Sequence, residues 1–178
     1  MSPLPQKTGA KGGGRRGRNK SQFGMQLAEK QQLKRVYGVR DEQLRRYFRL
    51  ARRQHAETGP ALIVLLESRL DNAVFRASMA ETRAQARQMV SHRFFTVNGR
   101  PVNIPSYGLS AGDTVQIKEG KRSKAYFTSF EKRMQNAHLP SWLALKVDEF
   151  GFAVTGSPSS EEAALGVHVQ SVVELLGR

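Results

Sequence analysis

The sequence contains no cysteine and only four histidines among its 178 residues. The lack of cysteine excludes disulfide bonds and any zinc site with thiolate ligands. The histidines are far apart in the chain and show no metal-ligand spacing; they are His55, His92, His138 and His168. We therefore expect no metal ion and no other cofactor.

Long apolar runs are missing as well. No stretch approaches the ~20 apolar residues that a membrane-spanning helix needs, and the N-terminus lacks the apolar core of a secretory signal. The N-terminus is basic up to Glu29, as organelle transit peptides are, but it is rich in glycine and has little apolar helical pattern. We expect a protein without a membrane partner.

Acidic residues are scarce relative to basic ones: 15 Asp and Glu stand against 29 Lys and Arg, which gives a net charge of +14. Residues 1–57 carry 15 basic and 4 acidic side chains, residues 58–133 carry 12 and 6, and residues 134–178 carry 2 and 5. Such a chain attracts polyanions, because neutralising phosphates releases condensed counterions. We expect the first three quarters of the chain to face nucleic acid.

The first 20 residues are of low complexity and have almost nothing apolar to bury, which predicts a disordered basic tail in the unbound protein. Its GGGRRG run is not a phosphate-binding loop, because no strand precedes it and no Gly-Lys-Ser/Thr ends it. We expect phosphate contacts from five of its six basic residues, namely Lys11, Arg15, Arg16, Arg18 and Lys20.

Helical periodicity begins after Ser21, a suitable N-cap for a helix over 22–37 that ends at Gly38. Asp41 is expected to cap a second helix, whose apolar positions follow the i, i+3, i+4, i+7 rule. Its other faces carry five arginines without an acid between them: Arg45, Arg46, Arg49, Arg52 and Arg53. Like charges at this spacing repel one another, so an anionic partner such as a phosphate backbone is expected on this helix.

A third helix is predicted to open at Thr58-Gly59-Pro60, with an apolar stripe from Leu62 that continues without a break to Val74. A further helix begins at Thr82, where Thr82 and Gln85 have the spacing of a capping box. Arg83 and Arg87 form an i, i+4 pair that we expect on its exposed side. The free N–H groups at this helix start also favour a phosphate.

The chain from residue 95 onward reads as strands and short segments. Asn98-Gly99 is a strong two-residue turn signal between strands at 95–97 and 100–104. Residues 114–118 alternate as another strand, and residues 119–124 read as a basic loop. A short helix at 129–136, an apolar anchor around a packed Trp142, and a strand or helix over 167–176 follow.

Four motifs in order make the 67–117 segment resemble the S-four RNA-binding domain: SRLDN at 68–72, TRAQAR at 82–87, VNGRPVNIPSY at 97–107 and AGD at 111–113. Three further motifs resemble the family of bacterial-type small-subunit ribosomal protein four: FGMQLAEKQQLKRVYGV at 23–39, QLRRYF at 43–48 and LPSWL at 139–143. Ordered motifs across such a span are far more specific than any one of them.

This resemblance implies an α+β fold, with a helical body and an S-four domain of two helices on a small, mostly antiparallel sheet. The expected divisions are a tail over 1–20, a body over 21–66 completed by 160–178, an S-four domain over 67–133 and a connecting segment over 134–159. The implied RNA contacts in the domain are Arg69, Arg76, Thr82, Arg83, Gln85, Arg87, His92 and Asn98, and those in the body are Lys34, Arg35, Arg45, Arg46 and Arg49.

The function implied by the resemblance is that of a structural constituent of the small ribosomal subunit. Family members bind small-subunit ribosomal RNA at a junction of several helices early in assembly, lie near the messenger entry channel and influence decoding accuracy. The implied partners are this RNA and neighbouring ribosomal proteins, and no stand-alone homo-oligomer is implied. The implied location is the ribosome of the cytoplasm, with an organellar ribosome as the alternative.

The chain departs from the family pattern in three places. It lacks the cysteine cluster that some members use for zinc, Arg93 stands where the family usually has Gly, and the residues from Thr155 onward match only loosely. The second of these departures falls on the lead into the predicted hairpin.

Two rival functions stay open from the sequence. The first is an enzyme, because S-four domains also occur on pseudouridine synthases and some tRNA synthetases, but no nucleophile–base pair or nucleotide loop is evident, and we expect no catalysis. The second is a free-standing RNA-binding or ribosome-rescue factor, from which the upstream 23–39 segment distinguishes this chain.

Overall fold

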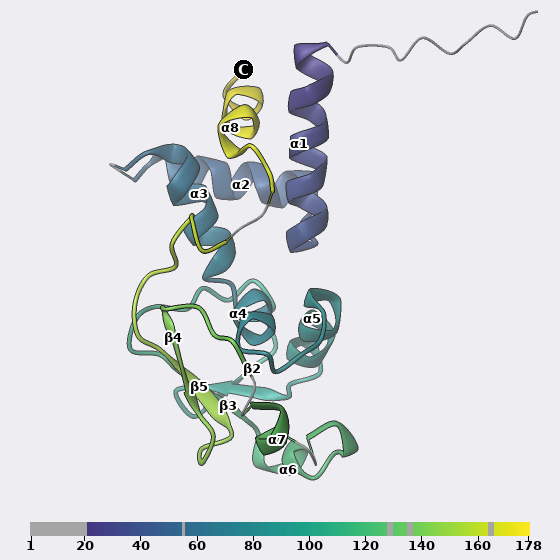
Figure 1. Ribbon diagram of the computed structural model, residues 1–178, viewed down its shortest axis with the longest axis vertical. Helices are drawn as coiled ribbons and strands as arrows, with labels where there is room; N and C mark the ends of the chain where they lie inside the picture. Colours follow the sequence, from purple (N-terminus) through teal and green to yellow (C-terminus); the bar gives the residue numbers. More distant parts are fainter. Residues whose placement is uncertain (1–20, 55, 128–129, 135–136, 164–165) are drawn as a thin grey trace, which may run out of the picture.

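The computed structural model describes residues 21–178 except residues 55, 128–129, 135–136 and 164–165. It has two lobes, a helical body and a mixed lobe built on a sheet (Figure 1). Helices α4 (Leu70–Arg76) and α5 (Arg83–Ser91) lie between the body and the sheet. The predicted α+β class is confirmed.

The body consists of α1 (Gln22–Tyr37), α2 (Asp41–Arg52), α3 (Thr58–Glu67) and α8 (Val169–Gly177). The predicted start of α1 is confirmed, because the Ser21 hydroxyl accepts a hydrogen bond of 3.2 Å from the Gly24 amide. At the other end, Gly38 adopts the left-handed conformation with φ of 60°, which glycine allows without a steric cost. The cap of α2 differs from the expectation, since Arg40 is the N-cap and Asp41 is the first helical residue.

The core of the body joins the two ends of the described chain. Val172 of α8 and Ala163 are buried together with residues of α1 and α3, among them Leu33 and Leu62. A hydrogen bond of 2.9 Å from Gln26 Nε2 to Glu174 Oε2 also joins α1 to α8. The segment over 167–176, for which strand and helix were both open, is therefore helical from Val169 and covers the body, as Figure 1 shows.

The apolar stripe from Leu62 to Val74 does not form one helix. Helix α3 ends at Glu67, and α4 starts at Leu70 after an extended Arg69 with φ of −67° and ψ of 140°. The chain breaks here because the Leu70 amide donates to the Tyr107 carbonyl at 2.8 Å, and the Leu109 amide donates to the Ser68 carbonyl at 2.8 Å. The break thus connects the body to the loop between two strands of the second lobe.

The sheet of the second lobe has five antiparallel strands in the order β2-β1-β3-β5-β4. They are β1 (Phe95–Val97), β2 (Arg100–Val102), β3 (Thr114–Ile117), β4 (Leu143–Lys146) and β5 (Gly151–Val154). Strands β4 and β5 come from the segment over 134–159 that was expected to be a connection. They extend the sheet because β5 pairs with β3, with Val115 opposite Phe152.

Gly151 is required where β5 meets β3. A Cβ atom at this position would lie 2.2 Å from the Val115 carbonyl oxygen, a distance that real Cβ atoms do not reach. The absence of a side chain therefore lets the two backbones pair.

Short elements complete this lobe. They are α6 (Glu119–Arg122), the 3-10 turn η1 (Ala125–Phe127) and α7 (Phe130–Met134). The basic segment over 119–124 is thus partly helical, although a loop was expected, and the predicted short helix near 129–136 is present as α7. Both lie at the far end of the molecule from the body (Figure 1).

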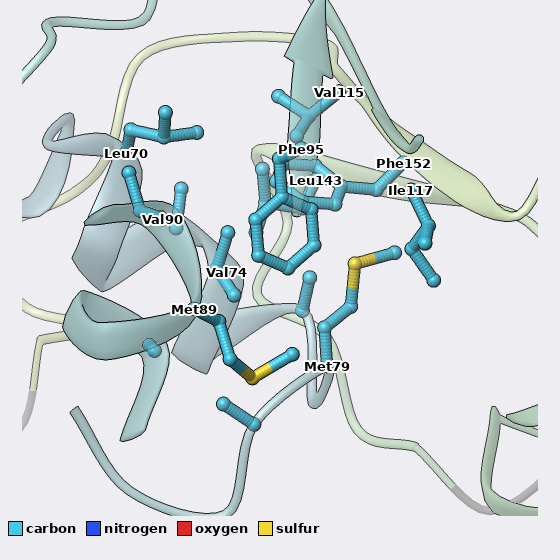
Figure 2. Close-up of a cluster of buried hydrophobic side chains, with 14 of the residues drawn as sticks. Leu70, Val74, Met79, Met89, Val90, Phe95, Val115, Ile117, Leu143 and Phe152 are labelled. Atoms are coloured by element: carbon cyan, nitrogen blue, oxygen red, sulfur yellow. The ribbon is translucent and has the colours of Figure 1, made fainter. Parts of the chain in front are cut away.

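The core of the second lobe lies between the sheet and α4 and α5 (Figure 2). Alternate residues of β1 and β3 point into it, since Phe95 faces Ile117 and Val97 faces Val115 across the two strands. Phe95 is fully buried, and truncating such a residue to Ala costs about 3–5 kcal/mol. Trp142 is buried in the same core, as expected for a packing residue.

The predicted hairpin turn is confirmed, with φ of 49° at Asn98 and 77° at Gly99. Asn98 also ties this turn to β3, because its Oδ1 accepts from the Thr114 amide at 2.9 Å and its Nδ2 donates to Asp113 Oδ1 at 2.8 Å. The Asn98 side chain therefore fixes the hairpin to its neighbouring strand.

Candidate RNA-binding surface

One face of α2 presents a row of arginines to solvent. Leu44, Phe48 and Ala51 are buried on the opposite side of the helix. The exposed residues, which we call the α2 arginine face, are Arg45, Arg46, Arg49, Arg52 and Arg53. Apart from Arg45, none of them lies within ion-pair distance of an acidic residue in the described part of the chain.

Asp41, at the start of α2, gathers three cations. Its Oδ1 lies 3.1 Å from Lys30 Nζ and 3.2 Å from Lys34 Nζ, and its Oδ2 lies 3.0 Å from Arg45 Nε. The hydrogen bonds from Arg45 and Lys30 hold the pKa of the Asp41 carboxyl well below its ordinary value. Of the predicted body contacts, Lys34 is therefore engaged by this carboxylate, whereas the nearby Arg35 is exposed.

A buried carboxylate joins the two lobes. Glu67, at the end of α3, is 1% exposed and accepts hydrogen bonds from the Tyr37 hydroxyl at 2.6 Å and from Asn72 Nδ2 at 2.8 Å. Arg76 donates twice, from Nε to Oε2 and from Nη2 to Oε1, both at 2.9 Å. We call Tyr37, Glu67, Asn72, Arg76 and Arg83 the Glu67 joint.

Charges in this joint stabilise one another. Burial alone would raise the pKa of Glu67, but the hydrogen bonds from Arg76 and Tyr37 outweigh it, so the carboxyl pKa lies below its ordinary value. Burial and the neighbouring Glu67 carboxylate raise the pKa of the Tyr37 phenol far above its ordinary value. The joint therefore holds an ionised Glu67 beside a neutral Tyr37 at neutral pH.

Arg76 and Arg83, two of the predicted RNA contacts, point into this joint. Arg76 Nη2 also donates to the Ala163 carbonyl at 2.9 Å, which connects the C-terminal segment. Arg83 Nε donates to Asn72 Oδ1 at 2.8 Å, and its guanidinium lies 4.4 Å from the centroid of the Phe75 ring.

The expectation that Arg83 lies on the exposed side of its helix is wrong. Its side chain is only 23% exposed, and it lies over the ring of Tyr37, 5.3 Å from the ring centroid. The reason is that this face of α5 meets the end of α1 instead of solvent. Burial, followed by the nearby Arg76, lowers the pKa of Arg83 from its ordinary value.

Arg69 is buried even more deeply, with 1% exposure. It forms two parallel hydrogen bonds to Asp71, from Nε at 3.0 Å and from Nη2 at 2.6 Å, and a third from Nη1 to the Tyr47 hydroxyl at 3.2 Å. Burial would lower the pKa of Arg69, but the Asp71 carboxylate raises it above its ordinary value. In this structure its guanidinium links α2 to α4.

The start of α5 follows the sequence prediction more closely. Thr82 is the N-cap, and its hydroxyl accepts from the Gln85 amide at 3.1 Å. The Gln85 side chain returns one residue earlier than in a regular capping box, since its Oε1 accepts from the Glu81 amide at 2.8 Å. Arg87 Nη1 donates to the Gly38 carbonyl at 2.5 Å, so this partly exposed arginine also bridges the lobes.

The end of α5 explains the unusual Arg93. Its backbone has φ of 57°, and its amide donates to Val90 while the Phe94 amide donates to Met89, which is the Schellman pattern of helix ends. Gly38 occupies the equivalent position of α1, where its own amide bonds to Arg35 and that of Val39 bonds to Lys34. The position of Arg93 therefore favours glycine, and both Arg93 and His92 are exposed.

The predicted contacts of the tail, Lys11, Arg15, Arg16, Arg18 and Lys20, lie outside the described residues. Among the rest, Arg35, Arg45, Arg46, Arg49 and His92 are exposed and Arg87 is partly exposed, whereas Lys34, Arg69, Arg76 and Arg83 are engaged by carboxylates or by the Asn72 amide. Glu67 and Asp71, the acidic partners of Arg69, Arg76 and Arg83, were not predicted as such from the sequence. The signal that could have revealed them is the alternation of acid and arginine in ESRLD at 67–71.

Two further observations concern the described residues. No helix in this part of the chain is both long enough and apolar enough to span a membrane. Likewise, no group of three or more His, Cys, Asp or Glu side chains among them is arranged to hold a metal ion.

Comparison with known proteins covers both lobes. Residues 3–67 match the family model of the ribosomal protein S4/S9 N-terminal domain, and residues 68–115 match that of the S4 domain. The chain is 45% identical over 161 residues to small ribosomal subunit protein uS4 of Kosmotoga olearia, which covers 90% of this chain and 77% of the relative.

Two further relatives are similar over a still larger part of the chain. Identity to uS4 of Herpetosiphon aurantiacus is 42% over 175 residues, covering 97% of this chain and 83% of the relative. Identity to uS4 of Roseiflexus sp. is 42% over 180 residues, covering 100% and 87%. Since both lobes match in order and nearly the whole chain aligns, this protein belongs to the family of small ribosomal subunit protein uS4.

Proposed function

We propose that this protein is a structural constituent of the small ribosomal subunit and binds its ribosomal RNA. The α2 arginine face is the observation that carries the proposal. Four of its five arginines have no acidic partner among the described residues, and their mutual repulsion is offset when phosphates lie between them. Family membership supplies the identity of the RNA.

The contact residues divide into two groups by exposure and by the partners of their side chains. We propose direct contact with RNA for the exposed basic side chains, for the partly exposed Arg87, which has no acidic partner among the described residues, and for the tail: Arg35, Arg45, Arg46, Arg49, Arg87 and His92, and Lys11, Arg15, Arg16, Arg18 and Lys20. The others act by shaping the surface that the RNA meets: Lys34, Arg69, Arg76, Thr82, Arg83, Gln85 and Asn98.

Recognition in this proposal depends on shape and phosphate position more than on base sequence. Arginines dominate the exposed surface, and they contact phosphates in any sequence. Structured RNA at a junction of several helices offers such a shape. Early binding there would hold the junction during assembly, and a position near the messenger channel would influence translational accuracy.

The proposed role is binding without catalysis, in the ribosome of the cytoplasm, with neighbouring ribosomal proteins as further partners. The alternative of a free-standing rescue factor is not favoured, because residues 3–67 match the ribosomal protein N-terminal domain in addition to the S4 domain. Sedimentation separates the two: an integral protein stays with intact small subunits in moderate salt, whereas a rescue factor is released.

A pair of matched double variants tests the proposal with the full chain. Arg46→Gln with Arg49→Gln removes two charges from the α2 arginine face, and Lys146→Gln with Arg178→Gln removes two from the acidic C-terminal part. Binding to a small-subunit ribosomal RNA transcript is measured over a range of salt concentrations. The first variant is expected to reduce the slope of log K against log salt by about 2, roughly 1 for each phosphate that is no longer neutralised.

The control variant is expected to keep the slope of the unmodified protein. An unchanged slope for the Arg46 and Arg49 variant, or an equal reduction in the control, would show that the α2 arginine face does not hold the RNA backbone.

A further inference from the structure

A groove of about 390 Å³ lies where the body meets the second lobe. One wall is the α2 helix, which contributes Gln43, Arg46, Tyr47 and Leu50 at helical spacing, and the other wall is the loop between β2 and β3. No acidic side chain lines it among the described residues. We call it the interlobe groove.

The aromatic wall of this groove is held in place before any ligand arrives. The Tyr47 hydroxyl accepts from Arg69 Nη1 at 3.2 Å, and the Arg69 guanidinium lies 5.7 Å from the centroid of the Tyr47 ring. Arg69 is in turn fixed by its two hydrogen bonds to Asp71. A partner that packs on the Tyr47 ring therefore meets a side chain whose rotamer is already set, which lowers the entropic cost of binding.

The opposite wall is the backbone around Gly108, which is hydrogen-bonded to the junction of α3 and α4. Gly108 pairs with Arg69 in an isolated antiparallel bridge, and the carbonyl of Tyr107 accepts from the Leu70 amide. A Cβ atom built on Gly108 would meet nothing within 4 Å. Gly108, which lines the groove, therefore has room for a side chain.

The groove combines groups that suit a nucleotide. Arg46 is an exposed cation without an acidic partner among the described residues, Tyr47 offers a ring, and Leu50 is 39% exposed at the same wall. The Gln43 Oε1 accepts from the Arg40 amide at 3.1 Å, and no described residue accepts from its Nε2. Arg46 can bind a phosphate, and a base can pack on the ring of Tyr47 and the apolar side chain of Leu50. The edge of that base can accept a hydrogen bond from the side-chain amide of Gln43.

We propose that the interlobe groove receives one unpaired nucleotide of the bound RNA. Its phosphate lies at Arg46 and its base packs against Tyr47 and Leu50. The volume falls within the range of about 300–1,000 Å³ typical of small-ligand sites. This inference depends on the proposed function, because the nucleotide is part of the ribosomal RNA that the protein binds.

The test compares two glycine-to-leucine variants of the full chain. Gly108→Leu adds a bulky side chain at the lining of the groove, and Gly120→Leu adds the same side chain at another position where a Cβ would meet nothing within 4 Å. Both are measured for affinity to the small-subunit ribosomal RNA transcript and for ultraviolet cross-linking, with mass spectrometry of the RNA-linked peptides. Leu50→Asp, which places an acid at the mouth of the groove, serves if Gly108→Leu does not fold.

In the unmodified protein the peptide containing Tyr47 is expected to carry a nucleotide. Gly108→Leu or Leu50→Asp should remove this cross-link and weaken binding about tenfold, the order of one base-stacking contact, while Gly120→Leu should retain both. If the unmodified protein binds the transcript without a cross-link at Tyr47, and the groove variants bind as tightly as Gly120→Leu, the groove inference is overturned. If the unmodified protein does not bind the transcript, the proposed function itself fails.

Discussion

Removing the charge of Glu67 tests whether the Glu67 joint holds the two lobes together. In Glu67→Gln the shape is kept, but the new amide donors face the hydroxyl of Tyr37 and the guanidinium of Arg76, which are donors themselves. Breaking a buried ion pair by removing one partner costs about 3–5 kcal/mol. Because the Arg76 side chain is 21% exposed and can regain some hydration, we expect a destabilisation at the lower end of that range, about 3 kcal/mol.

Urea unfolding followed by circular dichroism measures this destabilisation. With a slope of about 2 kcal/mol per M, a decrease of about 3 kcal/mol lowers the midpoint by about 1.5 M. Glu149→Gln is the matched control, since Glu149 accepts from Lys146 at 3.1 Å on the exposed surface, and we expect its midpoint to stay at that of the unmodified protein. A Glu67→Gln midpoint that coincides with the control would refute the assignment of the joint.

Acid provides a second readout of the same carboxylate. The folded-state pKa of Glu67 lies below its ordinary value of 4.5, so its stabilisation is fully present above about pH 4.5 and is lost as the pH falls through the folded pKa. The difference in unfolding free energy between the unmodified protein and Glu67→Gln should therefore shrink on acidification. Taking this difference removes the parallel contribution of Asp41, whose pKa is also lowered.

Two further substitutions test backbone conformation. Arg93→Gly removes the steric strain of a non-glycine residue in the left-handed conformation, with φ of 57°. We expect it to raise the unfolding free energy by about 1 kcal/mol. An unchanged or lower value in the same urea assay would contradict the helix-end assignment. Gly151→Ala places a Cβ against the Val115 carbonyl and is expected to separate β5 from β3, seen as faster amide hydrogen exchange in both strands; exchange at the rate of the unmodified protein would show that the strands tolerate a side chain here.

The sequence predicted local features of the fold well. The Asn98-Gly99 turn, the start of α1 at Ser21 and the cap of α5 at Thr82 each depend on a few adjacent residues. Strands β4 and β5 were missed, although β1, β2 and β3 are equally short or shorter and were predicted. Strand β4 pairs with β5, and β5 pairs with β3, which lies far away in the chain. No local pattern specifies the pairing of β5 with β3.

The arginines show why the candidate site could be predicted only in part from the sequence. The i, i+4 spacing of Arg83 and Arg87 predicts that they share a face of α5, but it does not say what that face meets. In the structure it meets the end of α1, so Arg83 lies over Tyr37 and Arg87 bonds to Gly38. The positive charge of the chain predicted a polyanionic partner. Only the fold distinguishes the arginines that are exposed to such a partner from those that connect the two lobes.

The packing of α8 on α1 has a consequence for the order of folding during synthesis. The second lobe uses residues 70–154, and its core is complete once those residues have left the ribosome that synthesises the chain. The body begins earlier in the chain, but its core includes Val172. Part of the apolar surface of α1, α2 and α3 therefore stays uncovered until α8 has been synthesised. We infer that the inserted lobe folds first, and that the body, together with its arginine face, reaches its final form only when α8 arrives.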